Sequence, residues 1–350
     1  MEKMLAAVFH KDKGKDTGKV KLEEVPKPEI EEDNQILIEV KACGICGTDL
    51  KILEGGHPAN DNTILGHEFS GIVRDVGNQV KDLIIGDKVI VDPNEKCGFC
   101  EACRRGLPNL CSHLATGTTF GIFQNGGFAN YCVVPRNSIF TIPKEMDLDS
   151  AALIEPLSCA IHCHNIADVR ESDNVVIIGA GSMGLIIETI IRPHPLKNLI
   201  CIEPDEWRAQ KALELGADYI INPTERNVKG EIEKITNRRG ANVIIDAVGI
   251  SDTFEMAQKI WAHGARLVCF GQDDRAIAHI RPNDIVRYQR QILGSYISTA
   301  CDFLDAIELI ANEIIEIEKL ITHQIELSEL LTKGFELMKG RQCIKIITNP

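Results

Sequence analysis

The chain has 350 residues, enough for two domains that each bury a core. Its formal net charge of -13 argues against a nucleic-acid partner, because no basic face follows from such a composition. There are 13 cysteines and no signal-peptide pattern, so we expect a cytoplasmic protein with thiol or metal chemistry instead of disulfides. The longest uncharged apolar run, residues 175–187, falls short of the ~20 residues that span a membrane.

Residues 1 to about 150 predict a β-rich domain. Short strand-like runs are broken by glycines and prolines, which is typical of all-β structure and not of alternating strands and helices. The lysine-rich residues 11–21 also contain aspartates and are predicted to form a solvated turn. The expected strands are residues 35–41, 70–75, 88–91 and 131–134.

Four cysteines lie close together near residue 100. Cys97, Cys100, Cys103 and Cys111 have C-x2-C-x2-C-x7-C spacing. Four thiolates in so short a segment suit a closed tetrahedral zinc site, which stabilises a loop without a core of its own. An iron–sulfur cluster and four free core cysteines are the competing interpretations, but the x7 gap departs from the bacterial ferredoxin pattern. Because no coordination position stays open, we predict a structural role.

A second set of metal-ligand residue types is scattered over the first 160 residues. It comprises Cys43 to Asp49 (CGICGTD), then His67 and Glu68, then Glu155. Each segment alone is weak evidence for a metal site. Cys43 and Cys46, for example, also fit a redox pair or half of a zinc ribbon. Together the pieces offer a soft ligand, an imidazole and two carboxylates, a set suited to a catalytic zinc with an open position.

The segment around residue 180 predicts dinucleotide binding. A β-branched run at residues 175–178 is followed at once by a G-x-G-x-x-G sequence and then by an expected helix over residues 185–191. In this order the glycines make the tight turn, admit a pyrophosphate and let helix pack on strand, and the helix N-terminus holds the anion. The residues concerned are Gly179, Gly181, Ser182, Met183 and Gly184.

Two residues bear on the choice of cofactor. Glu203 ends the next strand-like run, 19 residues after Gly184, where an acidic side chain accepts hydrogen bonds from an adenosine ribose. A carboxylate there repels a 2′-phosphate and favours NAD over NADP. Arg208 weakens that preference, because a nearby arginine accommodates the phosphate.

The pattern of strands and helices continues to Gly294. Six strand-like runs recur at intervals of roughly twenty residues, with amphipathic segments such as residues 206–215 between them, which predicts a doubly wound parallel sheet. A long amphipathic helix is expected over residues 302–318 and a last strand over residues 343–347. The six runs are residues 175–178, 199–202, 219–221, 243–245, 267–270 and 291–293.

These motifs together resemble the zinc-dependent medium-chain dehydrogenases, the family of alcohol, polyol and threonine dehydrogenases. The resemblance covers essentially the whole chain and rests on six motifs in the family's order. It implies a GroES-like, β-rich catalytic domain at residues 1–156 and 296–350, with a zinc lobe at 94–114, and a Rossmann NAD-binding domain at 157–295. The motifs are CGICGTD (43–49), GHEFSGIVRDVG (66–77), the four-cysteine lobe (97–111), GGFANY (126–131), EPLSC (155–159) and GAGSMG (179–184).

The resemblance also implies roles for single residues. Cys46 and His67 would ligate a catalytic zinc, Glu68 would be a ligand or a neighbouring carboxylate, and Glu155 falls on the family's fourth ligand position. Thr48 would carry the proton of the alcohol outward. Many family members have a histidine where this chain has Lys51, so the proton leaves through water or through Lys51 itself.

Glu155 also indicates the substrate. Simple alcohol dehydrogenases have a cysteine at that position, whereas the polyol branch has Glu-Pro, which favours a free or phosphorylated sugar alcohol oxidised by NAD. Residues 295–299 lack the Arg-Tyr pair of sorbitol enzymes, which argues against sorbitol itself. Threonine 3-dehydrogenase or simple alcohol activity is the alternative within the enzymes, and a nucleotide-sensing protein is the alternative outside them. The family implies a homodimer or homotetramer with two zinc ions per chain.

Overall fold

The computed structural model describes residues 2–114 and 117–350. The chain divides into two compact units, and the division falls within α4 (Ile154–Ala167). Unit 1 comprises Met1–Pro156 and Thr299–Pro350, and unit 2 comprises Leu157–Ser298. Unit 1 is therefore built from two segments that are separated in the sequence by all of unit 2.

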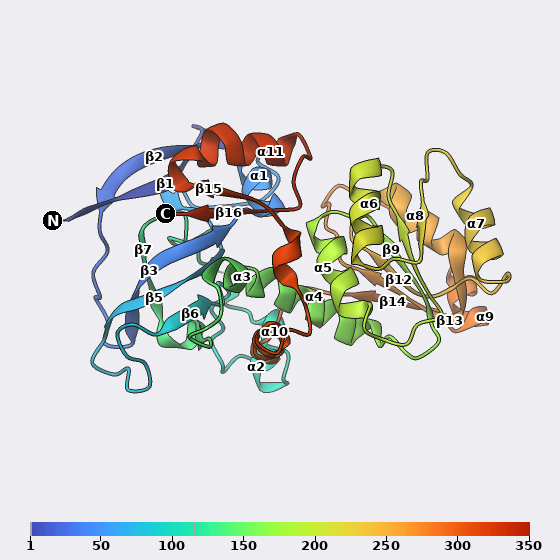
Figure 1. Cartoon of the computed structure of the whole chain (residues 1–350), viewed down its shortest axis with the longest axis horizontal. Coiled ribbons are helices and arrows are strands. Elements are labelled where there is room, and N and C mark those ends of the chain that lie inside the picture. The colour runs from blue at the N-terminus through green and yellow to red at the C-terminus, as the bar shows by residue number, and fades with distance from the viewer. Residues whose placement is uncertain (1, 115–116) are drawn as a thin grey trace. The chain divides into compact units, whose positions relative to one another are not determined.

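Unit 1 is built on two β-sheets, as the β-rich sequence predicts (Figure 1). The larger, seven-stranded sheet has the order β15-β16-β3-β5-β6-β8, with β7 also paired to β3, and the smaller has the order β2-β1-β4. Buried aliphatic and phenylalanine side chains from both sheets form one core. The strands are β1 (Lys3–Lys11), β2 (Gly18–Pro26), β3 (Gln35–Gly44), β4 (Thr63–Ile64), β5 (Glu68–Val76), β6 (Lys88–Val91), β7 (Tyr131–Pro135), β8 (Ile139–Thr141), β15 (Ile321–Glu326) and β16 (Lys345–Asn349).

The first two strands differ from the sequence-based expectation. Residues 11–21 were expected to form one solvated turn, but β1 runs to Lys11 and β2 begins at Gly18, in register as an antiparallel hairpin. Alternating burial explains the miss, because the lysines of β2 face outward while Val20 between them is buried. The lysines at positions 19 and 21 therefore lie on the exposed face of β2 and not in a turn.

The helices of unit 1 are short, and one of them ends earlier than predicted. The expected helix over residues 302–318 is α10 (Ala300–Ala311), and the chain then turns at Glu313, where φ is 55°. Thr299 caps its N-terminus by accepting a hydrogen bond from the N–H of Asp302. The other helices are α1 (Gly47–Leu53), α2 (Glu101–Arg104), α3 (Leu148–Ala152) and α11 (Phe335–Lys339).

The last strand of the chain lies inside the larger sheet and not at its rim. β16 pairs in parallel with β15 and antiparallel with β3, where Ile347 faces Gly44 (Figure 1). The N–H of Ile45 donates to the carbonyl of Ile346, 3.0 Å away. The end of the chain is thereby held against the segment that precedes α1.

Unit 2 is a single six-stranded parallel sheet with helices between its strands, which confirms the doubly wound fold. Its strand order is β11-β10-β9-β12-β13-β14, so the order reverses between β9 and β12. The strands are β9 (Asn174–Ile178), β10 (Asn198–Ile202), β11 (Tyr219–Ile221), β12 (Ala241–Asp246), β13 (Trp261–Cys269) and β14 (Gln291–Gly294). The helices are α5 (Ser182–Ile191), α6 (Glu206–Leu215), α7 (Val228–Ile235), α8 (Ser251–Ile260) and α9 (Pro282–Tyr288).

The glycine turn lies at this reversal point, between β9 and α5. Gly179 has φ of 94°, a left-handed conformation that favours glycine. A Cβ atom on Gly184 would lie 1.9 Å from the carbonyl oxygen of Gly179, so only glycine lets α5 start this close to the strand. The sequence order of strand, turn and helix is thus realised at the edge where dinucleotides bind in such sheets.

Within the part of the chain that the structure describes, the helices are all too short or too polar to cross a lipid bilayer.

Candidate metal and cofactor sites

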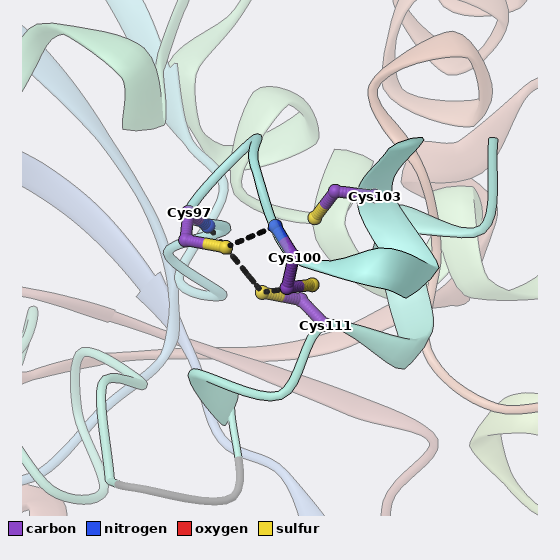
Figure 2. A group of neighbouring side chains, drawn as sticks. All are labelled: Cys97, Cys100, Cys103 and Cys111. Carbon is purple, nitrogen blue, oxygen red and sulfur yellow. Dashed lines mark hydrogen bonds between the residues drawn. The ribbon is translucent and has the colours of Figure 1, made fainter. Parts of the chain in front are cut away.

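The four cysteines of the lobe form a compact cluster (Figure 2). Cys97 Sγ lies 3.5 Å from Cys111 Sγ, and Cys100 Sγ lies 3.8 Å from the same sulfur. Sulfurs placed 2.3 Å from one zinc ion at tetrahedral angles are about 3.8 Å apart. The spacing of these sulfurs therefore matches a closed zinc site.

Backbone groups in the lobe favour thiolates. The N–H of Cys97 donates to Cys111 Sγ at 3.4 Å, and the N–H of Cys100 donates to Cys97 Sγ at 3.3 Å. Hydrogen bonds from the backbone N–H groups of Cys103 and Ser112 lower the pKa of the Cys100 thiol. These donors stabilise negative charge on the sulfurs of Cys97, Cys100 and Cys111, which is the form that binds zinc, whereas burial raises the pKa of Cys103 to about 12.

The second metal-binding group lies in unit 1 and brings Cys46 together with the consecutive residues His67 and Glu68. One ligand atom from each of Cys46, His67 and Glu68 lies within 4.8 Å of the others. Cys46 directly precedes α1, His67 follows β4, and Glu68 is the first residue of β5. His67 and Glu68 are buried, whereas Cys46 is partly buried, so solvent reaches the group only in part and at Cys46.

Buried polar atoms in this group lack hydrogen-bond partners. Asp49 Oδ2 accepts the N–H of Cys46 at 2.8 Å and so fixes the start of α1. Its other oxygen lies 3.7 Å from His67 Nδ1, and neither atom has a hydrogen-bond partner. Carboxylates commonly orient a metal-binding imidazole through the nitrogen that does not bind the metal. The arrangement therefore fits a metal on the other nitrogen of His67.

The electrostatics of the group favour a cation. Burial opposes a charge on the imidazole, but the Cys46 thiolate and nearby carboxylates outweigh it and raise the pKa of His67 well above its usual range. Burial also raises the pKa of Asp49 to about 6 and that of Glu155 to about 7. A positive ion among these groups would be stabilised at low local dielectric.

Glu155 is near this group without being one of the three. It lies in the first turn of α4 and is buried, and His67 and Glu68 both affect its pKa. Among the described residues, the set of ligand atoms within 4.8 Å of one another stops at Cys46, His67 and Glu68. The assignment of Glu155 as a zinc ligand therefore stays a prediction.

The residues predicted for proton transfer lie on α1. Cys46 Sγ and Thr48 Oγ1 are 3.6 Å apart, so the hydroxyl is next to the metal-binding group. Lys51 lies one turn along the helix and is exposed. Cys43, the other half of the C-x2-C pair, is fully buried in the core of unit 1.

Lys345 also belongs to the site, although no sequence pattern predicts it. Lys345, the first residue of β16, places its ammonium 2.7 Å from Oε1 and 2.5 Å from Oε2 of Glu68. Both side chains are almost fully buried, at 2% and 1% exposure. Burial opposes the charge of Lys345, but the Glu68 carboxylate outweighs it and raises the pKa of the lysine. A lone lysine in a terminal strand carries no sequence signal of such a partner.

In unit 2, Glu203 follows β10 and contacts the glycine turn. Its Oε2 accepts the N–H of Ala180 at 2.7 Å, and its Oε1 accepts the N–H of Asp205 at 2.9 Å. A carboxylate has about four acceptor positions, so these two bonds leave capacity for ribose hydroxyls. Arg208, one turn into α6, has a buried Nε without a hydrogen-bond partner.

Comparison with known proteins agrees with both units. Residues 32–144 match the model of the alcohol dehydrogenase GroES-like domain, and residues 194–312 match the model of the zinc-binding dehydrogenase domain. The chain is 30% identical to a sorbitol dehydrogenase of Bacillus subtilis, over 100% of this chain and 98% of that protein. The chain therefore belongs to the zinc-binding medium-chain dehydrogenases, which confirms the resemblance drawn from the motifs.

Other proteins that match the chain differ in the substrate or cofactor that their names give. An L-threonine 3-dehydrogenase of Bacillus subtilis is also 30% identical, over 94% of each chain. The crystal structure of a zinc-binding dehydrogenase from Sinorhizobium meliloti, bound to NADP, matches with a TM-score of 0.90 and 30% identity over 100% of both chains. The protein is accordingly a zinc-dependent alcohol or polyol dehydrogenase. Its cofactors are zinc, for a four-cysteine cluster and a Cys/His/Glu site, and a nicotinamide dinucleotide.

Proposed function

We propose that this enzyme transfers a hydride from a secondary alcohol of a free or phosphorylated sugar alcohol to NAD, which yields the ketose. The observation that carries the proposal is the acidic composition of the buried group in unit 1. Glu68 and Glu155 accompany one thiolate and one imidazole, where a simple alcohol dehydrogenase has a second thiolate. Oxygen ligands make a harder and more exchangeable set, which suits a substrate with neighbouring hydroxyls.

The residues of unit 1 take distinct roles in this proposal. Cys46, His67 and Glu155 hold the catalytic zinc, with Glu68 beside them. When bound, zinc acts as a Lewis acid that lowers the pKa of an alcohol hydroxyl. Thr48 accepts a hydrogen bond from the substrate hydroxyl and passes its proton outward, and the proton then leaves through Lys51 or through water.

The residues of unit 2 hold the cofactor. The N-terminus of α5, with Gly179, Gly181, Ser182, Met183 and Gly184, binds the pyrophosphate. Glu203 accepts hydrogen bonds from the ribose hydroxyls and repels a 2′-phosphate, so NAD is preferred over NADP. Arg208 weakens this preference, because its guanidinium accommodates a 2′-phosphate. In this proposal residues 157–295 are the NAD-binding domain, and residues 1–156 and 296–350 are the catalytic domain with its zinc lobe at 94–114.

An L-threonine 3-dehydrogenase activity is the second candidate. The relative with that name is as similar to this chain as the sorbitol dehydrogenase is, so overall identity does not separate the two substrates. A nucleotide-sensing protein without catalysis is disfavoured, because such a protein has no need for a buried thiolate, imidazole and carboxylate in one place.

The test is a panel assay of NAD reduction. Free and phosphorylated polyols, L-threonine and simple alcohols are compared, with NADP as the alternative acceptor. The proposal expects the largest kcat/KM for a polyol with NAD, and no turnover of any substrate by Cys46→Ser. Preference for L-threonine would support the second candidate, and equal rates for Cys46→Ser and wild type would contradict a zinc-dependent reaction.

We further propose that the enzyme is a cytoplasmic homodimer or homotetramer. The described cysteines are all free, which fits a reducing compartment. β14 is the last strand of its sheet, and Ile277 and Val286 nearby in the sequence are 78% and 76% exposed. An open strand edge is suited to pairing with a second copy, and exposed apolar side chains are typical of surfaces that associate. Light scattering that gives a monomer mass at micromolar concentration would contradict this.

A further inference from the structure

Asp246, the last residue of β12, is a buried carboxylate at the edge of the sheet that carries the glycine turn. It pairs in register with Ile178 of β9, which directly precedes that turn, and with Cys269 of β13. Only 1% of Asp246 is exposed. Among the described residues, its hydrogen-bond partners are all uncharged and no basic side chain pairs with it. Its charge is therefore held without a counter-ion.

Three uncharged donors fix this carboxylate. Oδ1 accepts the N–H groups of Val248 and Gly249 at 3.1 and 3.0 Å, and Oδ2 accepts the hydroxyl of Thr253 at 2.9 Å. Thr253 lies in the first turn of α8, where the helix dipole also favours negative charge. Burial raises the pKa of Asp246, and the three hydrogen bonds oppose that rise. The donors thus favour the ionised form in a buried place.

The turn that Asp246 holds contacts the glycine turn. The N–H of Ala247 donates to the carbonyl of Ile178 at 3.0 Å. A Cβ atom on Gly179 would lie 2.6 Å from Cγ2 of Val248, so this side chain packs on the first glycine of the turn. Val248 is nevertheless 38% exposed. An apolar surface beside the glycine turn is thus open to a ligand, one residue away from the carboxylate.

The loop after β13 is bound to the same residue. The N–H groups of Phe270 and Gly271 donate to the carbonyl oxygen of Asp246 at 3.1 and 2.8 Å. A Cβ atom on Gly271 would lie 2.5 Å from the backbone nitrogen of Gly249, so the two loops pack backbone against backbone. Burial, and then the charge of Asp246, raise the pKa of Cys269 to about 11. The field of the carboxylate therefore reaches the end of the neighbouring strand.

The strand order indicates which half of the cofactor lies near this charge. A doubly wound sheet binds a dinucleotide across two mononucleotide-binding halves. One half is β9 to β11, where Glu203 is assigned to the adenosine ribose, and the other is β12 to β14, which leaves the nicotinamide for the edge with Asp246. The nicotinamide ring is positively charged in NAD⁺ and uncharged in NADH. A buried carboxylate without a counter-ion attracts only the oxidised ring.

We propose that Asp246 determines the preference of the cofactor site for NAD⁺ over NADH, because it leaves one negative charge uncompensated beside the nicotinamide half. The inference rests on the proposed function, since it requires the dinucleotide to bind at the ends of β9 and β12. Its consequence is that NADH competes less with NAD⁺ for the free enzyme, which suits an enzyme that oxidises its alcohol.

The test is Asp246→Asn, which keeps an acceptor oxygen for Val248 and Gly249 and removes the charge. Dissociation constants are measured without substrate, for NADH by its fluorescence and for NAD⁺ by displacement of NADH. The ratio of the NAD⁺ constant to the NADH constant should rise by about fivefold or more. ADP-ribose, which lacks the nicotinamide, should bind as it does to the wild type.

A matched variant separates the charge from the support of the loops. Thr253→Val removes one hydrogen bond to Asp246 and keeps the carboxylate, so any loss of affinity should be equal for NAD⁺ and NADH and should leave their ratio unchanged. If Asp246→Asn does not fold, Asp246→Ser, which is also uncharged and keeps an acceptor oxygen, is measured in its place.

The outcomes distinguish this inference from the function beneath it. An unchanged ratio in folded Asp246→Asn would overturn it, as would an equal loss of affinity for NAD⁺, NADH and ADP-ribose, which indicates support of the loops alone. A ratio that shifts as much in Thr253→Val would assign the effect to hydrogen bonding and overturn the role of the charge. Wild-type protein that binds neither NADH nor ADP-ribose would overturn the proposed function as well.

Discussion

The two metal-binding groups of unit 1 are built in opposite ways. The four-cysteine lobe takes its ligands from residues 97–111, and neighbouring backbone N–H groups stabilise their charge. The group of Cys46, His67 and Glu68 takes its ligands from the starts of α1 and β5, and its surroundings include buried carboxylates and a lysine from β16. A closed site needs only a local loop, whereas a reactive site needs the tertiary fold.

That contrast has a physical reason. Four thiolates saturate a tetrahedral ion, so the lobe needs no further partners. A site that exchanges substrate keeps a weak or vacant position, and the charges around it must be balanced by residues that do not bind the metal. Asp49 and Lys345 supply such balance here.

Cys46→Ser should have the largest effect on activity and should remove metal only from the group of Cys46, His67 and Glu68. Because the thiolate is the soft ligand of the second site, its loss should remove that metal and lower kcat by at least about 10³-fold. Metal analysis should find one zinc per chain, retained by the lobe. Loss of both ions would show that the two sites depend on each other.

Thr48→Ala should separate chemistry from metal binding within the same group. Removal of a proton-transfer group costs roughly 10²-fold or more in rate. Zinc content and the dissociation constant for NADH, measured by fluorescence, should stay unchanged. An unaltered kcat would remove Thr48 from the proton path, and Ser in its place should keep most of the rate.

Cys111→Ser should damage the lobe and leave the chemistry of the remaining site intact. Three ligands hold zinc less tightly, and the unfolding midpoint should fall by roughly 3–4 °C, about 2–3 kcal/mol for a chain of this size. Differential scanning fluorimetry with and without added zinc measures the shift. Below the new midpoint, kcat should stay within about threefold of wild type.

Glu188→Gln should have the smallest effect on catalysis, because Glu188 lies outside both groups. Glu188 of α5 is fully buried, one of its oxygens accepts the N–H of Ala217 and the other has no partner, and burial raises its pKa to about 8. The folded state binds this proton more tightly than the unfolded chain, so stability falls as pH rises from about 4.5 to 8. The slope is at most about 1.4 kcal/mol per pH unit.

The glutamine variant carries no proton to lose, so this part of the pH dependence should disappear. Urea unfolding at pH 5, 6, 7 and 8 measures it, with Glu214→Gln on the exposed surface of α6 as the matched control. Parallel pH profiles for wild type and Glu188→Gln would contradict an uncharged carboxyl in the folded state.

The difference between the two groups also explains what the sequence revealed. The spacing of Cys97 to Cys111 alone predicts a zinc site, because residues that are close in the sequence are also close in space. Gly179 to Gly184 do so as well, because a turn between strand and helix is local. The partnership of Lys345 with Glu68 depends on the strand order β16-β3-β5, which no short pattern encodes. The hairpin of β1 and β2 was missed because its outward lysines masked the alternation.

The position of β16 has a consequence for how the molecule assembles. Because this strand lies between β15 and β3, the ribosome must deliver residues 345–349 before the larger sheet of unit 1 can close. Unit 2 is continuous in the sequence and is synthesised earlier, so it can fold while the first segment of unit 1 still waits for its second. Nascent chains stalled before β16 should therefore protect unit 2 from proteases and leave the metal-binding half open to them.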